Sequence, residues 1–146
     1  MPGRIEFDLL GTREMQAVLK QLGPAVAGRV ADAALRAGAR PIVAEAKRLV
    51  PRRTGALGRS ITAAIPRGRR RQRAAGALGD DARLILIGFK PPHSRRAHLA
   101  EFGWKHAAAQ PFIDPALESR QGAALDAMGA ALAAGIEREA HKLAGR

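Results

Sequence analysis

Polar and apolar positions alternate at the beginning of the chain and then change to a helical period. Residues 4–9 show the two-residue alternation of a half-buried strand. Apolar residues three and four apart then predict a helix over residues 12–22 and a longer helix over residues 25–49. Pro41 removes a backbone donor inside the longer helix, so we expect a kink or a brief break near Gly38.

Two strands joined by a charged connection are predicted after the long helix. Residues 56–65 and the more apolar residues 82–89 have the composition of strands. The residues between them are rich in arginine and contain glycine. A hairpin with a long basic tip at about residues 66–80 fits this pattern better than a second domain. Extended arms would let the tip reach roughly 23 Å from the body.

The C-terminal third begins with a loop and ends in a long helix. Residues 90–96 are expected to form the loop, and residues 97–104 are short enough for a strand or a single helical turn. Asp114 is the predicted N-cap of the last helix and Pro115 its first helical residue. The apolar positions from Leu117 to Leu143 stay close to one helix face.

The order of these elements predicts one α+β domain over residues 1–146, with a small antiparallel sheet. The sheet would contain a long strand hairpin, packed by the N-terminal helices and the long C-terminal helix. Hydrophobic residues make up 47% of the chain and aromatic residues only 3%, so alanine fills much of the core. Such a thin domain leaves apolar surface that partners could cover.

The charge of the chain favours a polyanionic partner. The formal net charge is +12, from 25 Lys and Arg against 13 Asp and Glu. Nucleic acid, an anionic membrane or an acidic protein would each be attracted. The absence of cysteine excludes disulfides and thiolate sites. No apolar run has the length of a signal peptide or a membrane span, so synthesis in the cytoplasm and no membrane partner are expected.

The residue patterns that support catalysis or metal binding are missing. The four histidines form no paired ligand motif, and His98, Glu101 and His106 are better explained as surface or interface residues than as a metal cluster. The serines lack a nucleophile elbow. The stretch RTGALGRS lacks the Gly-Lys-Ser/Thr ending of a phosphate loop and leads into a predicted strand. We therefore expect no catalytic residue, no cofactor and no metal.

A run of arginines in the predicted hairpin tip has two interpretations. The run is either a solvated loop or a set of contacts to phosphates. No aromatic residue is interleaved, so nucleic-acid binding there would be salt-dependent and independent of sequence. The arginines that could face DNA are Arg67, Arg69, Arg70, Arg71 and Arg73.

Two motifs, taken in order, resemble a known family. AKRLVPRRTGALGRSI (residues 46–61) is similar to the signature A-P-x-x-T-G-x-L-x-x-S-I of the tail-completion, or tail-terminator, proteins of long-tailed bacteriophages. AHLAEFGWKHAAAQPFIDPAL (residues 97–117) is similar to the second signature of that family, which contains E-F-G-T and P-F-x-x-P-A-L. The chain departs from the family at Arg96, where tyrosine is usual, and at Trp104, where threonine is usual.

The resemblance implies a non-enzymatic assembly protein of the virion. Members form a ring, usually sixfold, that caps the tail tube at the head–tail junction and lets the genome pass through its lumen. The implied partners are further copies of the chain, the tail tube protein, a neck or stopper protein, and double-stranded DNA in the lumen. Phages, prophages and gene-transfer particles share such proteins, which are made in the host bacterial cytoplasm.

The resemblance also implies roles for the motif residues. Gly55 would supply an unusual φ and Thr54 a side-chain bond to the backbone, whereas Leu57 and Ile61 would enter the core. The remaining family-motif and interface candidates are Ser60, Glu101, Phe102, Gly103, Trp104, Pro111 and Phe112. Of these, Glu101 would hold nearby backbone or an arginine, and Phe112 would pack the last helix on the sheet. Trp104, where the chain departs from the family, would be a larger anchor. For Glu101 and Trp104, a role at an interface and a role only in the monomer fold stay equally open. Two alternatives stay open: a stand-alone nucleic-acid-binding protein, and a neck stopper or adaptor.

Overall fold

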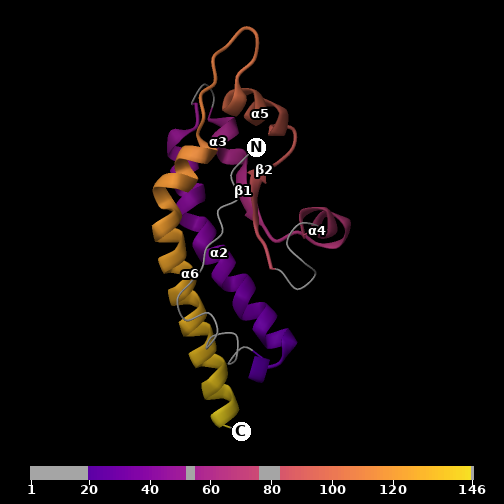
Figure 1. The fold of residues 1–146 in the computed structure, drawn as a ribbon, viewed down its shortest axis with the longest axis vertical. Helices are drawn as coiled ribbons and strands as arrows, with labels where there is room; N and C mark the ends of the chain where they lie inside the picture. Colours follow the sequence, from indigo (N-terminus) through magenta and orange to yellow (C-terminus); the bar gives the residue numbers. More distant parts are fainter. Residues whose placement is uncertain (1–19, 52–54, 76–82, 146) are drawn as a thin grey trace.

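Two long helices lying side by side form the body of the molecule (Figure 1). The structure is a computed structural model that describes residues 20–51, 55–75 and 83–145. The long helices are α2 (Pro24–Leu49) and α6 (Ile113–Ala144), and the shorter elements between them are α3 (Ala56–Ser60), β1 (Ile61–Ala64), α4 (Gly68–Ala75), β2 (Leu86–Phe89) and α5 (Ser94–Phe102). The predicted α+β class is confirmed. The predicted strand at residues 4–9 and most of the helix at 12–22 lie outside the described residues.

Helices α2 and α6 run antiparallel, and glycine allows their backbones to approach closely. A Cβ atom added at Gly38 would lie 2.3 Å from Met128 Cγ, and one added at Gly135 would lie 2.8 Å from Val30 Cγ1. Both distances are shorter than any van der Waals contact, so a larger residue at either position would push the helices apart. The small residues of the sequence therefore serve close helix packing.

Helix α2 continues without a break past Pro41, and the brief break considered near Gly38 is not found. Pro24 begins the helix, and the backbone becomes extended at Val50, directly before Pro51. Gly38 is buried against α6, so tertiary packing holds the helical conformation where propensity alone disfavours it.

The sheet is shorter than predicted. Strand β1 pairs with β2 in antiparallel fashion, with Ile61 opposite Phe89. The strand predicted over residues 56–65 is wrong at its start, because residues 56–60 form α3. Ser60 Oγ closes this turn by donating a 2.6 Å hydrogen bond to the Leu57 carbonyl. Within the predicted strand at 82–89, strand pairing begins only at Leu86.

The first arm of the predicted hairpin tip is helical instead of extended. Helix α4 occupies Gly68–Ala75, so the predicted reach of roughly 23 Å, which assumed ~3.3 Å per residue, is wrong. Arginine, glutamine and alanine are all good helix formers, which explains the outcome. Helix α5 likewise takes in the end of the predicted loop at 90–96, and residues 97–102 are helical rather than a strand.

The core lies where α2 ends, α6 begins and the sheet meets both. Its buried members are Ala46, Val50, Ile61, Ala97, Phe112 and Ala116. Phe112 is fully buried, and its ring meets the Phe89 ring edge-on at 5.7 Å between centroids. Phe112 thus packs the last helix on the sheet, as predicted.

An ion pair with a buried carboxylate joins the two long helices beside this core. Glu45 of α2 is 6% exposed and accepts hydrogen bonds from Arg48 on the same helix and from Arg120 of α6. The hydrogen bond from Arg48 is the main cause that holds the pKa of the Glu45 carboxyl below its ordinary value. This shift favours the charged carboxylate, which links α2 to α6 through Arg120 at 3.4 Å.

Candidate interaction surfaces

The TGALGRS motif forms the joint between α2 and the sheet. Gly55 has φ +73°, in the left-handed region that glycine adopts without strain, as the motif predicted. Leu57 packs against the core and Ser60 is buried in its own turn. Thr54 lies outside the described residues. The joint thus packs on the core, and the Ser60 hydroxyl already donates its hydrogen bond to a backbone carbonyl.

Glu101 at the end of α5 caps the long helix α6. Its carboxylate accepts hydrogen bonds from the backbone N–H groups of Phe112 at 2.8 Å, Ile113 at 3.1 Å and Asp114 at 3.2 Å. These are donors at the helix start that have no partner within the helix. A negative charge there also interacts favourably with the helix dipole. The predicted contact of Glu101 with backbone is confirmed.

The predicted capping by Asp114 is wrong. The N-cap is Phe112 and makes no side-chain cap, while Asp114 and Pro115 lie inside the first turn. Proline is tolerated there because the first turn needs no donor from it. The acceptor comes instead from a residue more than ten positions earlier, which local capping rules do not detect.

The segment between α5 and α6 is a loop with backbone hydrogen bonds to the end of α5 and within itself. The Gln110 N–H donates to the Ala100 carbonyl at 2.8 Å, and Trp104 and Ala107 exchange two backbone hydrogen bonds. Gly103 begins the loop with φ +75°, and an added Cβ would lie 2.7 Å from the Ala109 nitrogen. Only glycine fits this turn, which explains its place in the EFG motif.

Two large apolar side chains are exposed to solvent where α5 ends and this loop begins. Phe102 is 63% exposed and Trp104 is 51% exposed. Each packs on a histidine ring: Phe102 with His98 at 4.9 Å and Trp104 with His106 at 4.7 Å between centroids. With the exposed cations nearby they form what we name the aromatic–basic patch, defined as Arg95, His98, Phe102, Trp104, Lys105 and His106. Within the described part of the chain, no three His, Asp or Glu side chains are arranged to hold a metal ion.

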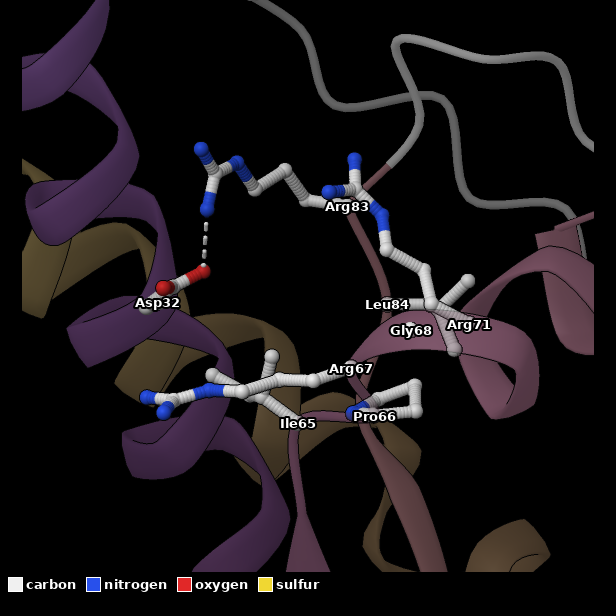
Figure 2. Close-up of a pocket in the computed structure, with 8 residues that line it drawn as sticks. All are labelled: Asp32, Ile65, Pro66, Arg67, Gly68, Arg71, Arg83 and Leu84. Atoms are coloured by element: carbon white, nitrogen blue, oxygen red, sulfur yellow. Dashed lines mark hydrogen bonds and ion pairs between the residues drawn. The ribbon is translucent and has the colours of Figure 1, made fainter.

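The arginine run lies on α4 and around a small cavity between α4 and α2 (Figure 2). The cavity has a volume of about 200 Å³. Arg83 Nη1 donates a 2.9 Å hydrogen bond to Asp32 Oδ1 on α2, and Arg67 and Arg71 also line the cavity. Asp32 is the one acid among the lining residues, against three arginines. Arg69, Arg70 and Arg73 are exposed on α4.

The predicted residues therefore fall into separate places. Gly55, Leu57 and Ser60 belong to the joint. Glu101 and Phe112 meet at the start of α6, and Phe102, Gly103 and Trp104 lie where α5 ends and the exposed loop begins. Pro111 is exposed directly before Phe112. The sequence did not predict the ion pairs Asp32–Arg83 and Glu45–Arg120. The two residues of each pair are more than fifty positions apart in the chain.

Comparison with known proteins decides the family. The family model described as "Bacteriophage HK97-gp10, putative tail-component" matches residues 13–103. The chain belongs to this HK97-gp10-like family. The match takes in the TGALGRS joint and the first part of the second motif, and it ends at Gly103, before the loop and α6. The chain has no significant match among curated proteins or among solved structures.

Membership makes this HK97-gp10-like protein a structural tail component of a bacteriophage virion that assembles with other tail proteins. The resemblance to tail-completion proteins agrees with this family. None of the described helices is long and apolar enough to cross a membrane.

Proposed function

We propose that this HK97-gp10-like protein forms a hexameric ring that terminates the tail tube and joins it to the head or neck. The observation that carries the proposal is the exposure of Phe102 and Trp104 at the end of the family-matched segment. Aromatic side chains with more than half of their surface in water are typical anchors of protein interfaces. The partners would be further copies of the chain, the tail tube protein and a neck or stopper protein.

The basic helix α4 supports a place for DNA in the lumen of such a ring. Five arginines fall within residues 67–73, and no acidic residue interrupts them. Among the ion pairs of the described residues, none involves an arginine of this run. These cations are therefore available to the phosphates of a passing genome, which they would contact without sequence preference.

Electron microscopy of tails assembled with and without the protein tests the ring. We expect six copies at the head-proximal end of each tube, and tubes of irregular length or without heads when the gene is deleted. Mass photometry of the purified protein gives the number of copies independently. A chain that stays monomeric alone and never joins tubes would contradict the proposal.

A stand-alone nucleic-acid-binding protein is the alternative that α4 favours. It predicts that replacing Arg69, Arg70 and Arg71 by glutamine abolishes tight DNA binding by the free protein. The slope of log K against log salt would become shallower by about 0.9 for each phosphate that the variant no longer neutralises. The matched control replaces the exposed arginines Arg29, Arg36 and Arg40 of α2, which changes the net charge equally. Free protein that ignores DNA at moderate salt excludes this alternative and leaves the ring standing.

A neck stopper or adaptor is distinguished by position in the particle. The terminator contacts the tail tube, whereas a stopper lies between it and the capsid. The same particle reconstruction that counts the copies places the ring on one side of this boundary.

A further inference from the structure

The excess of positive over negative charge lies in the middle segment of the chain. Residues 46–113 contain 15 Lys and Arg against three Asp and Glu, which accounts for the whole formal charge of +12. The rest of the chain, with ten residues of each sign, is neutral overall. In Figure 1, α6 forms one long edge of the molecule and α4 projects from the opposite side. The basic elements and α6 are therefore different surfaces.

The outer face of α6 is acidic and lacks large side chains. Residues three and four apart form what we name the α6 stripe: Glu118, Gly122, Asp126, Gly129, Ala133 and Glu137. All are exposed except Gly129, which is partly exposed. The ion pairs of the described residues leave its three carboxylates without a cation.

The two glycines of the α6 stripe face open space among the described residues. A Cβ atom added at Gly122 or Gly129 would meet no described atom within 4 Å, in contrast to Gly38 and Gly135, where the facing helix fills the space. Glycine inside a helix destabilises it relative to alanine. Two such residues seven positions apart on one exposed face indicate that a neighbouring molecule approaches the backbone there.

The aromatic–basic patch has the complementary shape and charge. The patch has the protruding side chains Phe102 and Trp104, whereas the α6 stripe has glycines. The patch also has the cations Arg95 and Lys105, whereas the stripe has only carboxylates as charged groups. Large aromatic side chains inserted over glycine, with cations beside carboxylates, give both close packing and a fixed orientation.

We propose that the aromatic–basic patch of one copy docks on the α6 stripe of the next copy. This inference rests on the proposed ring and identifies its two contact surfaces. Because the two surfaces differ, the contact is head-to-tail, and such a contact closes into a ring when the rotation between copies allows it. The arginines of α4 take no part in the contact and stay free for the lumen.

Two variants of the full chain separate the surfaces. The stripe variant carries Gly122→Gln and Gly129→Gln, which adds bulk to the shallow face without an apolar side chain. The patch variant carries Phe102→Glu and Trp104→Glu, which opposes the carboxylates of the stripe. The control variant carries Ala44→Gln and Ala134→Gln, at exposed helical positions outside both surfaces.

Mass photometry and electron microscopy on tail tubes measure assembly. The stripe and patch variants should each associate about tenfold more weakly or worse, while the control forms rings like the natural protein. An equimolar mixture of the two variants retains one intact contact per pair, so it should give heterodimers and no rings. At a protein concentration low enough for mass photometry to show monomers of both proteins, the Tm of the stripe variant should exceed that of the natural protein by about 2–8 °C, because glutamine is a better helix former than glycine.

Two results would overturn the inference while the proposed ring stands: variants that form rings as the natural protein does, or a mixture that restores full rings. A lower Tm of the stripe variant under these monomeric conditions would also overturn it, since another segment of the same chain would then cover this face. If the natural protein itself forms no ring, alone or on tubes, the proposed function fails and this inference fails with it.

Discussion

Replacing Phe112 by alanine is expected to lower the free energy of unfolding by about 3–5 kcal/mol. Phe112 is fully buried where α6 meets the sheet, and its ring contacts Phe89 edge-on. Truncation removes this contact and leaves a cavity among small residues such as Ala46 and Ala116, which have little side chain to fill it. Urea unfolding followed by circular dichroism measures the change in stability.

The matched control is Phe102→Ala, the same substitution at a side chain that is 63% exposed. It should change the free energy of unfolding by no more than about 0.5 kcal/mol. Equal decreases at the two positions would mean that Phe112 does not anchor the core.

Replacing Glu101 by alanine should lower the free energy of unfolding by about 2–4 kcal/mol. The substitution leaves three backbone N–H groups at the start of α6 without their acceptor. It also removes the negative charge at the positive end of a 32-residue helix. Thermal and urea unfolding measure the total effect, and hydrogen exchange at residues 112–114 locates it.

Glu101→Gln keeps one acceptor oxygen and should destabilise the protein less than the alanine variant. Glu137→Ala, at an exposed glutamate far from the helix start, should change stability little. If all three variants unfold alike and exchange at residues 112–114 is unchanged, Glu101 does not cap the helix.

Periodicity predicted the long helices because each has a continuous apolar face over many turns. Helix α2 was predicted within one residue at its start, since Pro24 and Pro51 mark its limits in the sequence itself. The α+β class followed from the order of elements. The family resemblance required only the two motifs, and residues 13–103 carry the match that confirms it.

Short elements were less predictable because local hydrogen bonds and helix propensity decide them, and the apolar pattern reports neither. Residues 56–60 contain Leu57 and border a strand, yet a hydroxyl-to-carbonyl bond within five residues closes them into α3. The arginine run lacks an apolar face, so no pattern indicated that α4 would be helical. The helix propensity of arginine, glutamine and alanine favours a helix there, whereas the predicted hairpin assumed extended backbone.

The candidate surfaces were predicted in part. Trp104 and the arginine run were singled out by residue type, and both include exposed side chains. Glu101 was expected to hold backbone, but the particular donors depend on α5 and α6 meeting end to end. The α6 stripe was not predicted, because the sequence does not show whether a glycine in a helix faces another helix or open space.

The loop between α5 and α6 has a consequence for the speed and strength of association. Hydrogen bonds from Gln110 to Ala100 and between Trp104 and Ala107 fix its backbone in the isolated chain. The entropic cost of ordering this loop is therefore met during folding and not again when a partner arrives. Trp104 is presented as a preorganised anchor, so docking can proceed as a nearly rigid-body encounter instead of a coupled folding reaction.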